Sequence, residues 1–178
     1  MALLIATGVV AATTPSAADW EQPFVVHASI GEPITGRNIA VTVHAATVVD
    51  RVFDDRWSST PGSTWVVVDA SAAVVHTETA ATIRHAVLVV GDRSYAASTR
   101  SSAFVLNSVA LSIDVPTRGW LAFELPADAL SARGAERARL ELAMNADPRL
   151  DSMIVATVDL TSVPALAEVE LSDAVWGE

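Results

Sequence analysis

The sequence contains no cysteine and no lysine among its 178 residues. The absence of cysteine excludes disulfides, thiolate-ligated zinc and thiol catalysis. All the positive charge is arginine, and 21 acidic residues against 11 basic ones give a formal net charge of -10. An acidic chain without a basic patch argues against nucleic acid as a partner and against electrostatic attachment to anionic lipid, because both depend on neutralising phosphates.

Aromatic residues are also scarce, at 6% of the chain, although 51% of the residues are hydrophobic. Valine and alanine supply most of that apolar content. Short and β-branched side chains favour thin packed layers, which are typical of a β-sandwich rather than a helix bundle. The length fits one domain with extensions.

The stretch from Trp65 to His76 shows the clearest pattern, because apolar residues alternate along it with a period of two. This alternation predicts a strand with one fully apolar face that a second sheet must cover. The inward set is Val66, Val68, Ala70, Ala72 and Val74, and the outward set is Trp65, Val67, Asp69, Ser71 and Ala73.

Further strands are expected wherever short alternating stretches lie between turn signals. They cover residues 24–30, 38–49, 83–90, 93–97, 119–125, 137–144 and 152–160, with one edge strand near 167–171. In the second of these we expect Ile39, Val41, Val43 and Ala45 to point inward. Residues 50–63 read as a polar loop, and 127–136 as a connection with one helical turn. The whole pattern predicts an all-β antiparallel sandwich of about seven to nine strands; a closed barrel is the alternative.

The chain begins with the uncharged run MALLIATGVVAA, which is too short to span a bilayer but long enough for the core of an export signal. We interpret residues 1–18 as an export signal or the remnant of a membrane anchor, with a true start upstream as one explanation for the missing basic residues. A buried N-terminal strand or helix is the alternative. A linker at 19–23, the sandwich at 24–163 and a C-terminal extension at 164–178 complete the predicted organisation.

Three segments carry a family resemblance: WVVVD at 65–69, VLVVGDRSY at 87–95 and GWLAFELP at 119–126. Their order resembles the immunoglobulin-like extracellular domains of bacteria grouped with the immunoprotective extracellular antigens. The resemblance covers roughly residues 38–144. It implies an immunoglobulin-like sandwich, secreted, lipid-anchored or membrane-tethered, of unknown function and without shared catalytic residues. The lysine-free, Ala/Val/Arg-rich composition resembles that of actinobacterial proteins.

Candidate chemical sites are few, and we expect neither a catalytic site nor a metal or other cofactor. The histidines lack the spacing of a metal site, and we interpret them as solvated or hydrogen-bonded residues; they are His27, His44, His76 and His85. The acidic cluster Asp50, Asp54 and Asp55 reads as a solvated turn beside Arg51 and Arg56, with calcium binding as the alternative. Asp69 and Glu124 are expected to pair with surface arginines such as Arg93 or Arg139.

Two tryptophans are the candidate binding residues. If Val66 and Leu121 face the core, then Trp65 and Trp120 face the outside of the sheet. Large apolar groups on an outer face indicate either a partner site or a surface that the chain itself covers, here by the N-terminal segment or by the tail with Val175 and Trp176. The sequence thus predicts a non-catalytic extracytoplasmic domain with an envelope or membrane protein as partner; an envelope hydrolase or a metal-carrier sandwich is the alternative.

Overall fold

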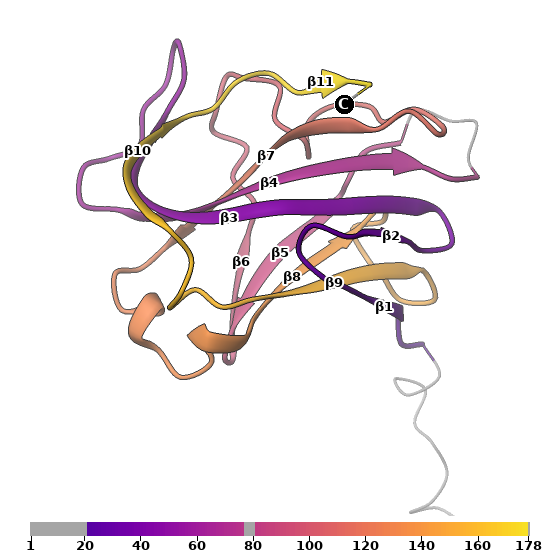
Figure 1. Ribbon diagram of the computed structural model, residues 1–178, viewed down its shortest axis with the longest axis horizontal. Helices are drawn as coiled ribbons and strands as arrows, with labels where there is room; N and C mark the ends of the chain where they lie inside the picture. Colours follow the sequence, from indigo (N-terminus) through magenta and orange to yellow (C-terminus); the bar gives the residue numbers. More distant parts are fainter. Residues whose placement is uncertain (1–20, 77–80, 178) are drawn as a thin grey trace, which may run out of the picture.

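The computed structural model describes residues 21–76 and 81–177, which form two facing β-sheets (Figure 1). Sheet A has the strand order β1-β9-β8-β5-β6. Its strands are β1 (Phe24–Ala28), β9 (Ser152–Val158), β8 (Ala138–Ala143), β5 (His85–Val90) and β6 (Arg93–Ala96).

Sheet B has the order β10-β3-β4-β7-β11, and a short strand, β2, also pairs with β3. Its strands are β10 (Ala165–Glu170), β3 (Ile39–Phe53), β4 (Thr64–Val74), β7 (Thr117–Leu125), β11 (Val175–Trp176) and β2 (Pro33–Thr35). The β7–β8 connection carries two single turns of 3-10 helix, Ala129–Ser131 and Ala135–Arg137. None of the described residues forms a helix long and apolar enough to cross a membrane.

The predicted alternation of β4 and β7 is confirmed. Val66 and Val68 on β4, and Leu121 and Phe123 on β7, are fully buried in one cluster between the sheets. The same cluster holds Ala138, Leu140, Leu142 and Met144 around β8, and Ile154, Ala156, Val158 and Leu160 around β9. Alternate positions of the valine-rich strands therefore form the core of the sandwich.

The prediction for β3 is wrong after Val43. The register against β4 shifts between Val43 and Ala45, so that His44 becomes the extra residue of a β-bulge. A bulge reverses which side chains face inward, and consequently Ala45 is exposed while Ala46 is buried. β3 also continues to Phe53, into the stretch predicted as loop.

The predicted all-β sandwich is confirmed, and its strand count is close to the expected seven to nine: the described residues form eleven strands, of which β2 and β11 have only three and two residues. The edges differ from the antiparallel prediction, because two edge pairs, β1 with β9 and β10 with β3, are parallel. The neighbours β9-β8-β5 in sheet A and β4-β7 in sheet B follow the G-F-C and B-E order of the immunoglobulin sandwich. Residues 164–177, predicted as an extension, supply both outer strands of sheet B.

Candidate functional site

The outer face of sheet B, where both predicted binding residues lie, is largely covered by the chain itself. Trp65 is 0% exposed and belongs to a second buried cluster. The other members of that cluster are Val49, Val52, Val67, Val105, Ala122 and Leu171. Trp65 therefore offers no surface to a partner in this structure, and its part in the predicted partner face is corrected.

Loops and the tail together close this cluster. The Trp57 ring meets the Trp65 ring edge to face, with 5.8 Å between the ring centroids, and the Arg100 guanidinium lies 5.2 Å from the Trp65 centroid. The tail contributes Leu171, which packs in the cluster and donates its N–H to the Phe53 carbonyl at 2.7 Å. Coverage by the tail was predicted through Val175 and Trp176, but both side chains are exposed.

Trp120 remains partly accessible. Its ring is half-buried against the same cluster, and its indole N–H donates to the Ser172 hydroxyl at 3.2 Å. Beside it, Arg118 forms a two-point ion pair with Asp69, with N–O distances of 3.0 and 2.7 Å. Two parallel hydrogen bonds fix the guanidinium plane relative to the carboxylate plane, so both side chains next to Trp120 are held in one orientation.

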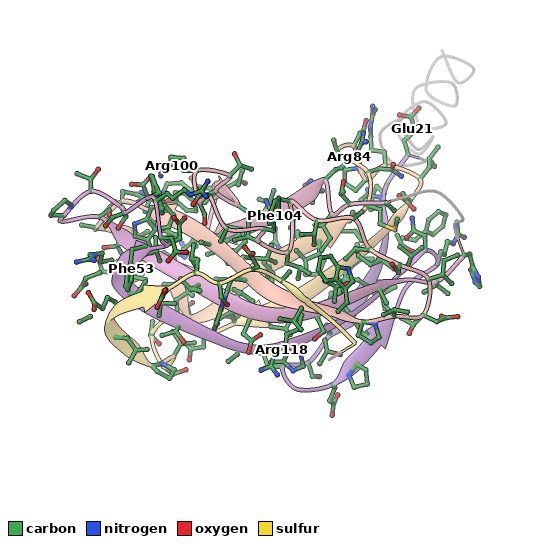
Figure 2. The ribbon with its side chains drawn as sticks, turned by 90° about the horizontal axis from the view of Figure 1, so that it is seen from above. Glu21, Phe53, Arg84, Arg100, Phe104 and Arg118 are labelled. Carbon is green, nitrogen blue, oxygen red and sulfur yellow. The ribbon has the colours of Figure 1, made fainter. Side chains whose placement is uncertain are left out.

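A groove of about 390 Å³ opens on this face between the 54–56 loop, the 102–104 loop and the tail. We call it the acidic groove, and it is lined by Asp54, Asp55, Arg56, Phe104, Glu170 and Asp173, among others. Four carboxylates thus face one guanidinium. Phe104, at the edge of the groove, is 62% exposed, and Figure 2 shows this residue midway along the sandwich.

Asp54 organises the wall of the groove. One carboxylate oxygen accepts the N–H groups of Arg56 and Trp57, both at 2.8 Å, and the hydroxyl of Ser102 at 2.7 Å. The other accepts the Ser101 hydroxyl and the Ser102 N–H, both at 2.7 Å. Burial alone raises the pKa of Asp54, but these hydrogen bonds outweigh it and hold that pKa well below its usual range. Asp54 therefore joins two loops that are distant in sequence.

The other carboxylates of the groove divide into two kinds. Asp173 is engaged, because it accepts the Phe104 N–H at 2.8 Å, while Phe104 in turn accepts the Ala174 N–H at 2.8 Å. Asp55 and Glu170 are exposed, and their carboxylates make no hydrogen bond or ion pair with the described residues. Their charges are available to something outside the chain.

The two strand carboxylates do pair with surface arginines, as predicted, but not with the two arginines named: Asp69 pairs with Arg118. Glu124 pairs with Arg100 from the 98–102 loop rather than with a strand arginine. Arg93 reaches Asp128, and Arg139 pairs with Glu141 on its own strand. Cross-strand geometry alone did not identify these partners, because two of the pairs join strands to loops.

The histidines lie apart on the sandwich. His27 and His76 are exposed, and His44 at the β3 bulge contacts the Ser71 hydroxyl at 2.7 Å. His85 lies 3.6 Å from a Glu141 carboxylate oxygen. Over residues 21–76 and 81–177, no three histidine, aspartate or glutamate side chains gather in a way that could hold a metal ion.

Sequence reasoning missed Phe104, Glu170 and Asp173 as surface features. Phe104 lies in a stretch without strand or helix periodicity. Glu170 is the last residue of β10, and Asp173 lies in the connection from β10 to β11, so neither carries a motif that marks it as part of a site. Only Asp54 carried a local signal, since an aspartate two residues before a loop N–H is typical of an Asx-turn.

No protein-family model matches the chain, and no curated protein matches it. Two solved structures share its fold. An uncharacterized β-sandwich protein from Clostridium difficile 630 superposes with a TM-score of 0.50 at 11% identity, over 82% of this chain and 99% of that one. A protein from Staphylococcus aureus subsp. aureus NCTC 8325, described as a "putative lipoprotein", superposes with a TM-score of 0.52 at 6% identity, over 80% of this chain and 97% of that one. The chain is thus an all-β sandwich similar to bacterial sandwich proteins without an assigned activity.

Proposed function

We propose that the protein is a non-catalytic, immunoglobulin-like binding module on the outer side of a membrane, held there by the segment near residues 1–18. It binds another envelope protein through the acidic groove. The strand order and the three resembling segments support the antigen-type extracellular family. The lysine-free, Ala/Val/Arg-rich composition supports an actinobacterial origin. The staphylococcal neighbour's description is compatible with an envelope location.

The observation that carries this proposal is the groove beside Phe104. An exposed aromatic ring next to two unengaged carboxylates suits a cationic side chain, because a cation can contact the ring face and an acid together. The partner segment we expect therefore presents an arginine or a lysine, with Trp120 at the rim of the contact. This keeps the predicted role of Trp120 and replaces Trp65 with Phe104.

The direct test is cross-linking in the cells that make the protein. A photo-reactive phenylalanine derivative at position 104 should give a discrete adduct with one envelope protein. The matched control carries the derivative at Ile30, which is also exposed but lies outside the groove. Absence of an adduct at position 104, or the same adduct at both positions, contradicts the proposal.

The contribution of the two free carboxylates is tested by neutralising them in the same assay. Asp55→Asn and Glu170→Gln together should weaken the adduct at position 104 several-fold, because they remove the two carboxylates that lack an internal partner. Glu32→Gln and Asp92→Asn together are the control, since they remove two exposed acids outside the groove. Equal loss in both proteins would assign the effect to net charge and not to the groove.

A further inference from the structure

Exposed apolar side chains gather at one end of the sandwich. We call this end, where the described chain begins at Glu21, the proximal end; Figure 2 places Glu21 and Arg84 there and Phe53 and Arg100 toward the opposite end. Of the ten large apolar side chains that are exposed in the described residues, five lie on strand ends or loops toward this end. They form the proximal patch: Phe24, Ile113, Val115, Leu150 and Trp176.

Contacts between the sheets bring these strand ends together. The Arg37 N–H, just before β3, donates to the Ser152 hydroxyl at the start of β9 at 2.7 Å. The Asn38 amide donates to the Asp151 carboxylate at 2.8 Å. Phe24 opens β1 and pairs with Ser152. The start of β3 is therefore joined directly to the starts of β1 and β9.

Sheet B carries the remainder of the patch at the same end. Ile39, the first residue of β3, pairs with Val74, the last residue of β4, and Val74 bridges to Ile113. Trp176 pairs with Thr117, the first residue of β7. The patch thus follows one rim of both sheets rather than a single strand.

Leu150 is the most unusual member of the patch. Its φ is 61°, a left-handed conformation that a branched apolar residue adopts at a cost, and its side chain is 59% exposed. Asparagine or glycine would suit this backbone better. Neither the local backbone geometry nor core packing explains why this residue is a leucine. Contact with an apolar surface outside the protein would explain it.

The apolar run at residues 1–12, part of the proposed membrane attachment, indicates which surface that is. Ala12 ends the apolar run and precedes Phe24 by twelve residues, so Phe24 lies within about 40 Å of the end of that run even if the chain between them is fully extended. Phenylalanine, tryptophan and leucine are also the residues that enter the interfacial layer of a bilayer most readily.

The charged groups around Arg149 at the proximal end are net negative. Arg149 contacts both Asp147 and Glu21, with N–O distances of 2.6 and 2.9 Å, and Asp151 accepts the Asn38 amide. Three carboxylates against one guanidinium give these groups a negative charge, which does not attract anionic headgroups. With a formal net charge of -10 on the whole chain, any membrane contact has to be apolar.

We propose that the proximal patch rests in the interfacial layer of the lipid bilayer to which the chain is tethered. This orients the sandwich end-on and leaves the acidic groove, on the outer face of sheet B, open to a partner. The inference rests on the proposed membrane tether but not on the groove or its partner.

The absence of cysteine allows single-site probes in the full chain. Leu150→Cys and Trp176→Cys are each labelled with an environment-sensitive fluorophore, and Leu166→Cys on β10, 51% exposed and outside the patch, is the control. Each protein is reconstituted with phosphatidylcholine vesicles and recovered by flotation. Labels at 150 and 176 should shift to shorter emission wavelength and be quenched by spin-labelled lipid, while the label at 166 stays accessible to aqueous iodide. Replacing a third of the lipid by phosphatidylglycerol should not strengthen either effect.

Each outcome decides a different claim. A chain that floats with the vesicles while all three labels report water keeps the tether and overturns the end-on contact. A chain that does not float overturns both. A wavelength shift at 150 and 176 that appears without vesicles and rises with protein concentration identifies a second copy as the occupant, and overturns the lipid contact. Unfolding curves of the labelled proteins that match the unlabelled chain confirm that each reading comes from the folded sandwich.

Discussion

Replacing Asp54 by asparagine tests how the loops over the outer face of sheet B are held. An asparagine keeps the size of the side chain but presents one acceptor oxygen where the carboxylate presents two. The donors from Ser101 and Ser102 then face an NH₂ group instead of an oxygen. Because hydrogen bonds to a charged group contribute about 1.5 to 3 kcal/mol each, and this site is only partly buried, we expect a total loss of about 2 to 3 kcal/mol.

The pH dependence makes this prediction specific. The folded pKa of Asp54 is depressed, so its stabilisation is complete above the unfolded value of about 3.9 and is lost as the pH falls below it. The difference in unfolding free energy between the wild type and Asp54→Asn should be constant from pH 7 to pH 5. It should be about 1 kcal/mol smaller at pH 3, because only the unfolded carboxyl is protonated there.

Urea unfolding, followed by tryptophan fluorescence at each pH, measures this difference. Asp55→Asn is the matched control, since the neighbouring carboxylate has no partner among the described residues, and it should change stability by less than about 0.5 kcal/mol. Equal effects of the two variants at pH 7, or a difference for Asp54→Asn that stays the same down to pH 3, would refute the role given to Asp54.

Three further predictions concern stability and share the same urea assay. Gly91→Ala should lower the free energy of unfolding by about 2 kcal/mol or more, because φ is 62° and a Cβ atom would lie 2.6 Å from a backbone carbonyl oxygen. Gly62→Ala, at φ 86° with open space around it, should lower it by only about 1 kcal/mol. Equal losses would exclude the steric reason. Leu150→Asn should raise stability by about 0.5 to 1 kcal/mol by relieving the left-handed conformation, and a loss would mean that the leucine serves the fold. Trp65→Ala should cost about 3 to 5 kcal/mol and Trp120→Ala about 1, and the reverse order would contradict the assignment of Trp65 to a sealed cluster.

The inner faces of the sheets could be predicted from the sequence because period-two alternation is a local property of the chain. Val66 and Val68, like Leu121 and Phe123, face the core because they occupy alternate positions of their strands. The bulge at His44 could not be predicted, because a bulged residue has no distinctive residue type in the sequence. The bulge nevertheless moves every later side chain of the strand to the opposite face of the sheet.

The covering of the outer face required contacts that are distant in sequence. Trp65 was placed on the correct face, but its burial depends on Trp57, Val105 and Leu171, which three separate segments bring to it. The same is true of the acidic groove, whose walls meet because Asp54 binds a loop 47 and 48 residues away. Periodicity assigns a residue to a face, whereas the loops that cover that face follow from tertiary contacts that leave no pattern in the sequence.

Sheet A covers the inner face of sheet B, and the loops and the tail cover most of its outer face. The surface proposed for binding is the part of the outer face that remains accessible. The most direct measurement is the reactivity of a single thiol at Val67, on the outer face of the central strand and 1% exposed. In the native full chain Val67→Cys should resist an aqueous thiol reagent as completely as Leu121→Cys in the core, while Leu166→Cys reacts at once. Rapid labelling of Val67→Cys in a protein whose Leu121→Cys counterpart stays protected would show that the outer face is open, and would contradict the account.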